Sequence, residues 1–334
     1  MKTMTKLKIL LSDTHFGVKN NSLTWLKSQT EFIEKQLIPY IKSARKHADE
    51  ISLYHLGDVF DSRSSINVMV LFKVNELLSQ LAMACDKMII LGGNHDYYSP
   101  SDTGKYNVNS IDWLELPENC TVLSSEWLRV GDELFLPWFW FNTPDRLEEA
   151  MKANSDAKII YTHADLTHLN NTEKIYMNGR TVFSGHIHTP CINGRLYTLG
   201  SCYAITFADA NQERGFYTME NLDPNTLEFH PNTKSIKFHR LHGEEFKNAE
   251  KIINPRDYVE LYMSNAEYSK KETAKIISKI NDKCTCNVVI STTIEDAEKS
   301  VYELRDFDII DLCREHVPEH LSEKFNKIAE SIKN

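Results

Sequence analysis

The chain has 334 residues, of which 41% are hydrophobic and 25% charged, and its formal net charge is −9. This length exceeds the usual range of a single hydrophobic core, so we expect a main domain with one or two accessory units. No run of about 18 uncharged apolar residues occurs, which argues against a membrane-spanning helix. The negative charge disfavours nucleic-acid binding through a broad basic surface. The N-terminus enters a predicted strand without the apolar region of a signal peptide, so we expect a cytoplasmic protein.

Five short apolar runs along the chain each stop where a polar cluster begins. The runs occupy residues 8–11, 51–56, 87–91, 158–161 and 180–183. The polar clusters contain, in chain order, Asp13 and His15, Asp58, Asn94 with His95 and Asp96, His163, and His186 with His188. This pattern predicts buried strands that end in loops. If these strands belong to packed sheets, their ends converge, and clusters far apart in the sequence can form one site.

The elements between the clusters predict the fold class. Residues 23–48 are apolar at helical spacing, and Pro39 is expected to kink this helix. A second helix is predicted over residues 65–84, and its wide apolar face is more typical of a core than of an interface. Further strands are predicted at residues 133–138, 195–199 and 215–219. This order is typical of a mixed α/β (α+β) fold in which a two-sheet β-sandwich is flanked by helices.

The second half of the chain predicts accessory units. A shift in composition near residues 221–235, rich in Asn, Asp and Pro, marks a boundary, and we place the core domain at residues 1–225. Residues 226–294 contain a strand, helix, strand pattern and are predicted to form a small αβ domain. Residues 295–334 are charged and helical with a thin apolar stripe, which suits packing on their own domain or docking to another chain.

The residue types in the clusters indicate the class of metal. Carboxylates, imidazoles and one Asn amide suit borderline divalent ions, and no cysteine lies in a cluster, which argues against a thiolate zinc site. Manganese is our first choice, with Mg, Fe and Zn as alternatives. Asp58 follows a strand-ending glycine and is the natural bridge between two ions. Each cluster alone is weak, because the pair His186 and His188 also fits a strand end with one inward and one packed histidine.

Taken in order, the clusters match the pattern D-x-H, GD, GNH[DE], H and GHxH, and the chain resembles the calcineurin-like metallophosphoesterases. The resemblance implies two groups of metal ligands. The first ion would be held by Asp13, His15, Asp58 and His188. The second ion would be held by Asp58, Asn94, His163 and His186. The resemblance also implies that His95 is the acid that protonates the leaving oxygen, an effect worth about 10² to 10⁴ in rate, and that Asp96 orients its ring.

Flanking residues make the chain similar to nuclease subunits of the SbcD and Mre type, and most of all to the phage recombination endonuclease subunit. The similar segments are residues 11–17, 57–63, 136–138 and 185–188. This resemblance implies a DNA nuclease, a 3′ to 5′ exonuclease and endonuclease, that acts at DNA ends in recombination and double-strand break repair. It implies a bacterial or phage-infected cell and places DNA recognition in a capping domain at residues 226–294.

The same resemblance implies two protein partners. One is an SMC-like coiled-coil ATPase of the SbcC type, which would bind residues 295–334. The chain has no G-x-x-x-x-G-K-[ST] loop, so any ATP dependence must come from that partner. The other is a second copy of the chain, because helices after the GD motif form a homodimer in this family. We therefore predict that Met69 and Phe72 are partly exposed.

The negative charge bears on how such a protein would hold DNA. Basic residues near the motifs, Arg214 among them, are expected to be mostly solvated surface. We therefore expect weak DNA binding by the isolated chain, with affinity supplied by dimerisation or by a partner.

Residues beside the motifs have alternative interpretations. Some Mre-type members carry a second histidine after the GD motif, where this chain has Asp61. Asp61 either supports a neighbouring side chain or caps a helix that begins near Ser64. Tyr97 and Tyr98 either stack on a base of a single strand or anchor their loop by packing. Arg63 is a candidate contact to the substrate.

Two other functions use the same residues. A small-molecule phosphodiesterase or phosphomonoesterase would share the core and differ in its preference for small substrates. A mainly architectural subunit that regulates the ATPase would need no acid, and the intact pair of His95 and Asp96 argues against it. The sequence therefore favours a metal-dependent DNA nuclease.

Overall fold

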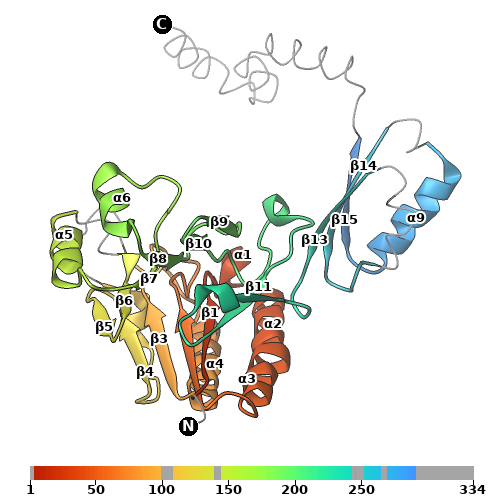
Figure 1. Cartoon of the computed structure of the whole chain (residues 1–334). Helices are drawn as coiled ribbons and strands as arrows, with labels where there is room; N and C mark the ends of the chain where they lie inside the picture. The colour runs from red at the N-terminus through yellow and green to blue at the C-terminus, as the bar shows by residue number, and fades with distance from the viewer. Residues whose placement is uncertain are drawn as a thin grey trace, which may run out of the picture. The chain divides into compact units, whose positions relative to one another are not determined.

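The computed structural model describes residues 4–98, 108–138, 144–242, 245, 252–264 and 269–290. The chain divides into two compact units, Met1–His239 and Arg240–Asn334. The first unit contains two six-stranded sheets with helices beside them, and the second contains a three-stranded sheet (Figure 1). The predicted mixed α/β fold with a two-sheet core is therefore confirmed. Among the described residues, no helix is both long and apolar enough to cross a membrane.

The first sheet has the strand order β12-β11-β1-β2-β3-β4. Its strands are β1 (Lys6–Leu11), β2 (Glu50–His55), β3 (Lys87–Leu91), β4 (Cys120–Leu123), β11 (Gly215–Glu220) and β12 (Glu228–Pro231). Strands β1 to β4 are parallel, whereas β11 runs antiparallel to β1. The carboxyl ends of β1, β2 and β3 therefore lie at one edge, where the first three polar clusters begin.

The second sheet has the strand order β5-β6-β7-β8-β10-β9. Its strands are β5 (Leu128–Val130), β6 (Glu133–Leu136), β7 (Ile159–Thr162), β8 (Thr181–Ser184), β9 (Cys191–Asn193) and β10 (Leu196–Thr198). Strands β6, β7, β8 and β10 are parallel. Strand β7 ends immediately before His163, and β8 ends two residues before His186, so this sheet delivers the last two clusters.

Helices flank both sheets of the first unit (Figure 1). They are α1 (Val18–Asn21), α2 (Leu23–Phe32), η1 (Ile33–Leu37), α3 (Ile38–Ala44), α4 (Val68–Ala84), α5 (Pro144–Ala153) and α6 (Asn171–Met177). Short 3₁₀ turns are η2 (Ser110–Trp113), η4 (Phe207–Asp209) and η5 (Pro224–Thr226). The irregularity expected at Pro39 is the π-helical turn η1, which lies just before the proline, where the missing N–H removes one helical hydrogen bond.

The space between the two sheets is filled largely by aromatic side chains. Tyr54 lies edge-on to Phe135 and Tyr161, with ring centroids 4.8 and 4.9 Å apart, and Tyr161 stacks on Phe183 at 5.6 Å. All four side chains are buried. Because these rings come from both sheets, their packing holds the sheets together.

A buried ion pair also joins the sheets. Lys8 of β1 places Nζ 3.7 Å from the carboxylate of Glu133 of β6 and 3.2 Å from Ser52 Oγ. Both charged side chains are almost completely buried. Burial lowers the pKa of Lys8, and the negative charges of Glu133 and Glu50 oppose this effect. The pair is therefore sensitive to the loss of either partner.

The second unit has its own small core. Strands β13 (Phe238–His242), β14 (Tyr258–Met263) and β15 (Thr285–Ile290) form its sheet, with helix α9 (Lys271–Asn281) beside it. The core contains Leu241, Ile253, Val259, Leu261, Met263 and Ile280. The strand, helix, strand pattern predicted here is present.

The boundary between the units differs from the predicted one at residue 225. Strand β12 pairs with β11 in the first sheet, so the core unit extends to His239. The segment at residues 221–235 that suggested a boundary contains the turn between these two strands, strand β12 and the residues that follow it. The predicted helical segment at residues 295–334 lies outside the described residues.

We predict that Glu133→Ala lowers the free energy of unfolding by about 3–5 kcal/mol, because the ammonium group of Lys8 loses its buried partner. Urea unfolding followed by circular dichroism measures this loss. Lys6 and Glu50 form a more exposed pair, 3.0 Å apart, and supply the control. Lys6→Met is expected to change the free energy by less than about 1 kcal/mol. Equal losses in the two variants would contradict the prediction.

Candidate metal centre

The loops that carry the first two clusters are held together by their backbones. Asp13 N–H donates to Gly57 O, and His15 N–H donates to Asp58 O, each at 3.0 Å. The loop after β8 joins them, because His186 N–H lies 3.2 Å from both carboxylate oxygens of Asp13. The clusters therefore meet over one small volume, as the positions of the strand ends predict.

The first group of candidate ligands faces one point. His15 Nε2 lies 3.0 Å from His188 Nε2, and the two nitrogens lie 3.8 and 3.9 Å from Asp13 Oδ1. His15 Nε2 is also 3.5 Å from Asp58 Oδ2. Two imidazole nitrogens and two carboxylates at such distances form a donor set that suits a divalent cation.

The second group of candidate ligands surrounds the Asn94 amide oxygen. His163 Nε2 lies 3.0 Å and His186 Nδ1 lies 2.7 Å from Asn94 Oδ1. Asp58 Oδ1 is 3.3 Å from His163 Nε2. The imidazole rings, the amide and the carboxylate are all well placed to share a second cation.

Asp58 is common to both groups. Its Oδ2 faces His15, and its Oδ1 faces His163. The same Oδ1 accepts a hydrogen bond of 2.8 Å from the backbone N–H of His95, which limits rotation of the carboxylate. One oxygen directed to each group is the arrangement that a bridging carboxylate needs.

The backbone at the centre is unusual. Asp13, His15, Asp58 and His186 have φ angles of 55°, 38°, 55° and 80°. Such left-handed conformations are unfavourable for residues with a Cβ and concentrate at functional sites. Gly93 is needed for a different reason, the close packing of two loops. A Cβ at this position would lie 2.2 Å from the backbone nitrogen of Asp58. The loops therefore approach more closely than any larger residue would permit.

The His163 ring is oriented by the backbone. Its Nδ1 lies 2.7 Å from Leu56 O, so it carries the proton and donates to this carbonyl. This hydrogen bond directs Nε2 toward Asp58 and Asn94 and fixes the tautomer that a metal ligand requires. Gly57 allows the close approach, since a Cβ there would lie 2.3 Å from His163 Nδ1.

The structure changes the role expected of Asp96. The carboxylate of Asp96 accepts backbone N–H groups of Val59, Phe60 and Gly93 at 3.2, 3.0 and 2.9 Å. The His95 ring is instead held by the main chain of Asp61, whose carbonyl lies 2.7 Å from Nδ1. Asp96 therefore braces the two loops, and Asp61 O orients the ring.

The side chain of Asp61 supports His15. Its Oδ1 lies 3.3 Å from His15 Nδ1. The alternative role as a helix cap is wrong, because α4 begins at Val68 and the side chain of Asn67 caps it by accepting Met69 N–H at 2.8 Å. The predicted start of this helix near Ser64 was early because the serines before it form a turn instead.

The two tyrosines after the third cluster have different environments. Tyr97 is buried, packs against Trp138 with ring centroids 5.4 Å apart, and donates its hydroxyl proton to Ser124 O. A base contact for Tyr97 is therefore wrong, and packing anchors the loop. Tyr98 is 59% exposed. Arg63 is half-buried, and none of the described residues pairs with its Nε.

The structure adds two residues that the sequence analysis missed. Arg214, which was expected to be solvated, is buried; it donates to His188 O and, at 2.6 Å, to Asp209 Oδ1. Gln29 donates to the carbonyls of Thr14 and His15 at 2.9 and 3.2 Å. Both hold the backbone of candidate ligands. Neither lies in a motif, so a single sequence contains no signal for them.

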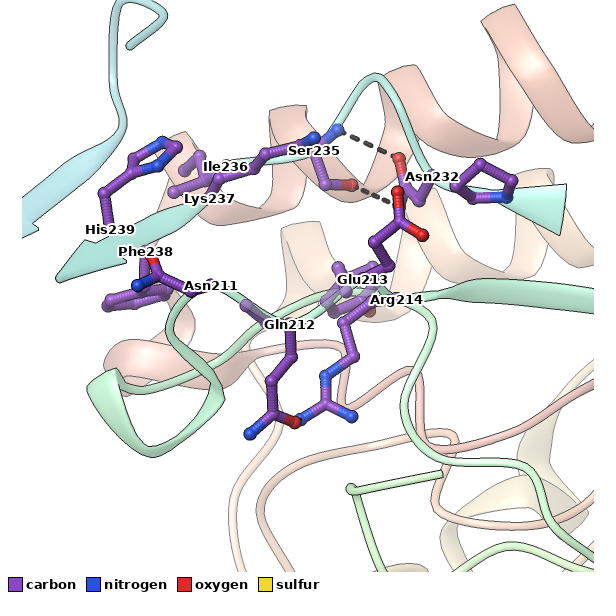
Figure 2. A pocket seen from close by; sticks show the side chains of 13 residues that line it. Asn211, Gln212, Glu213, Arg214, Asn232, Ser235, Ile236, Lys237, Phe238 and His239 are labelled. Carbon is purple, nitrogen blue, oxygen red and sulfur yellow. Dashed lines mark hydrogen bonds between the residues drawn. The ribbon is translucent and has the colours of Figure 1, made fainter. Parts of the chain in front are cut away.

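Arg214 also lines a cavity of about 180 Å³ (Figure 2). Within it, Arg214 Nη2 donates to Gln212 Oε1 at 2.9 Å, and Asn232 Nδ2 donates to Ser235 Oγ at 2.9 Å. Because Arg214 also donates to His188 O, it links this cavity to the backbone of a candidate ligand.

The charges at the centre favour the protonated form of two of the imidazoles, those of His15 and His163, whereas burial lowers the pKa values of His186 and His188. Burial by itself lowers the pKa of His15, but the nearby carboxylates of Asp13, Asp61 and Asp58 outweigh it and raise the pKa to about 10. Burial likewise opposes protonation of His163, while the nearby carboxylate of Asp58 raises its pKa to about 9. These positive rings occupy the place where cations would bind and would have to lose their protons.

Comparison with known proteins identifies the family. The family model described as calcineurin-like phosphoesterase matches residues 9–190, which include all five clusters. The chain belongs to this family. Its expected activity as a hydrolytic phosphoesterase is thereby confirmed, and the family implies divalent metal ions at the centre.

Individual relatives are more distant. The chain is 26% identical over 270 residues to exonuclease subunit 1 of Enterobacteria phage T4, covering 76% of this chain and 75% of that protein. The nuclease MPE of Pseudomonas putida is 20% identical, with a TM-score of 0.29, over 57% of this chain and 66% of that one. A putative 5′-nucleotidase from Staphylococcus aureus is 13% identical, with a TM-score of 0.37, over 68% and 53% of the two chains. Neither structural score supports an inference about function.

We predict that metal binding releases protons and strengthens as the pH rises. His15 and His163 carry protons below pKa values of about 10 and about 9, so a metal ion must displace them. Between about pH 6 and about pH 8 the affinity is expected to rise up to about tenfold per pH unit for each proton displaced. Calorimetric titration with manganese in buffers of different ionisation enthalpy counts the protons. An affinity independent of pH would contradict the prediction.

Proposed function

We propose that the protein is a manganese-dependent DNA nuclease subunit that hydrolyses phosphodiester bonds at DNA ends in recombination and double-strand break repair. The position of His95 carries the proposal: its ring lies against that of His15, with centroids 4.8 Å apart, beside both groups of candidate ligands. Family membership supports phosphoester hydrolysis, and the relative that is an exonuclease subunit supports DNA as the substrate.

The ligand sets in this proposal are those of the two groups described above. One ion would be held by Asp13, His15, Asp58 and His188. The other would be held by Asp58, Asn94, His163 and His186. Bound there, divalent ions would polarise a phosphate and activate water for attack on phosphorus. The support is the donor chemistry, imidazole, carboxylate and amide, together with the two differently directed oxygens of Asp58.

The residues of the chain account for departure of the leaving group. Because His95 Nδ1 donates to Asp61 O, the other ring nitrogen, Nε2, is the atom that would pass a proton to the departing sugar oxygen. The carbonyl also holds the ring in place, so the acid is oriented before the substrate binds. Activity as a 3′ to 5′ exonuclease and as an endonuclease forms part of the proposal.

The proposed partners follow from the same relative, which is named as a subunit. We infer an SMC-like ATPase partner that binds residues 295–334. We also infer that the region 226–294, whose described part includes β14, α9 and β15, helps to recognise DNA. A net charge of −9 for the whole chain supports a role for a partner, because the chain has no surplus of basic residues with which to hold DNA alone.

A homodimer through α4 is part of the proposal. One face of this helix is buried in the core, whereas Val68, Met69 and Phe72 are 80%, 56% and 67% exposed. The predicted exposure of Met69 and Phe72 is therefore confirmed. Large apolar side chains grouped on one exposed helix face favour contact with a partner.

We predict that the purified protein degrades linear DNA with manganese and that His95→Ala lowers the rate about 10² to 10⁴-fold. Manganese binding is expected to persist, since His95 is not a proposed ligand. Gel analysis of single-stranded and double-stranded DNA measures the rate. His168→Ala supplies the control, because His168 has a side chain that is 84% exposed.

Other outcomes separate the competing functions. Full activity of His95→Ala would contradict the acid role. Hydrolysis of small phosphate esters without loss of DNA would favour a small-molecule esterase. Activity on DNA only after addition of an ATPase partner would indicate a subunit that depends on its complex.

We predict that the wild-type protein is a dimer at micromolar concentration and that Met69→Glu with Phe72→Glu makes it a monomer, because the charges prevent burial of this helix face. Multi-angle light scattering measures the mass. Ile192→Glu changes an exposed apolar residue on β9 and is expected to leave the dimer intact. A monomeric wild type would exclude the proposed dimer.

A further inference from the structure

A second cavity lies beside the candidate metal centre. It has a volume of about 200 Å³ and is lined by the loop after Asp61, by residues next to His95, by the turn η2 and by one residue of α4. The residues important here are Ser62, Arg63, Asp96, Tyr98, Val108 and Trp113. This volume is well above the roughly 10–15 Å³ that a single water needs, so the cavity can hold a larger group.

The cavity is connected to the acid through neighbouring residues. Ser62 follows Asp61, whose carbonyl holds the His95 ring, and Asp96 follows His95 itself. Hydrogen bonds fix the opposite wall: Ser110 N–H donates to Asp96 O at 2.8 Å, and Tyr98 N–H donates to Val108 O at 3.0 Å. The cavity therefore lies next to the residues that hold the acid.

Exposed aromatic rings line the cavity and make part of its surface apolar. Trp113 and Tyr98 are 74% and 59% exposed, although both belong to residue types that are usually well buried. Val108 adds an exposed apolar surface. Aromatic faces of this kind stack on nucleobases without regard to sequence, and every unpaired base offers such a face.

Arg63 adds a positive charge that none of the described residues pairs. No described residue forms a hydrogen bond with its Nε, which is buried, and no ion pair to its guanidinium occurs within the described residues. In a chain with a net charge of −9, acidic residues outnumber basic ones, so an arginine that no described acidic residue pairs is available for an anionic ligand. The guanidinium fork matches a phosphate in geometry and charge, so an anionic ligand would satisfy it.

We propose that this cavity binds an unpaired nucleobase of the substrate, stacked on Trp113 and Tyr98, while Arg63 contacts the neighbouring phosphate. The inference rests on the proposed nuclease function and names its substrate class: single-stranded DNA or a frayed end, because a paired base is not free to leave its stack. The guanidinium of Arg63, which no described residue pairs, favours a nucleic-acid strand in this cavity over an apolar protein surface.

The test compares two substrates in the full-length protein. Trp113→Ala and Arg63→Gln are each expected to raise the KM for a single-stranded oligonucleotide about tenfold. The preference for the oligonucleotide over bis(p-nitrophenyl) phosphate, taken as the ratio of kcat/KM values, is expected to fall by a similar factor. Trp113→Phe should restore most of this preference. Ile192→Ala, which changes an exposed residue on β9, serves as the unchanged control.

Abasic oligonucleotides test the stacking directly. Removing the base from a nucleotide next to the scissile bond should lower the wild-type preference to that of Trp113→Ala and should have little further effect on that variant. Variants that degrade DNA with the wild-type KM, or that lose both substrates equally, would overturn the inference. If Trp113→Ala made the protein monomeric and left its KM unaltered, the cavity would bind a second copy of the chain and not a nucleobase, and the inference would be overturned.

Failure of the proposed nuclease function can be distinguished from failure of the proposed nucleobase site. If the wild-type protein hydrolyses bis(p-nitrophenyl) phosphate but no DNA, the nuclease proposal fails. The anisotropy of a labelled single strand then decides the cavity alone: weaker binding by Trp113→Ala and Arg63→Gln than by the wild type supports it, and equal binding overturns it.

Discussion

The position of the Asp58 carboxylate is the constraint on which the arrangement of the other candidate ligands depends. Its two oxygens face different groups of candidate ligands, at 3.5 Å from His15 Nε2 and 3.3 Å from His163 Nε2. To reach this position the residue adopts a φ of 55°, and its backbone approaches Gly93 so closely that no side chain fits there. Two parallel strands and a glycine loop are therefore arranged around one carboxylate, and the other ligands are placed relative to it.

The many buried polar groups of the centre need hydrogen-bond partners, and the backbone of the surrounding loops provides them. Asp96 receives three N–H groups from the loops around Asp58, and Leu56 O and Asp61 O hold the rings of His163 and His95. Burial together with the charge of Asp58 raises the pKa of Asp96 to about 7, and these N–H groups oppose the rise. The backbone groups around the site therefore hold the candidate ligands in defined positions.

The acidic character of the chain can be reconciled with an anionic substrate. Electrostatic attraction over a wide surface is weak at a net charge of −9, so recognition must rely on local contacts and on partners. In the proposals above, the cavity beside His95 would supply such contacts through exposed rings and the guanidinium of Arg63, which no described residue pairs, and the exposed face of α4 would bind a second subunit. Affinity, specificity and catalysis would then reside in different parts of the assembly.

The sequence by itself determined the strands, the clusters that follow them and the candidate ligands. Apolar runs of the right length specify buried strands locally, and parallel strands must bring their carboxyl ends to one edge. The roles of single residues depended on neighbours from distant parts of the chain. Tyr97 and Tyr98 are adjacent and identical, yet one packs under Trp138 and the other is exposed. Arg214 is buried only because Asp209 and His188 O meet it. Burial and hydrogen bonding are properties of the folded surroundings, so only the tertiary structure decided them.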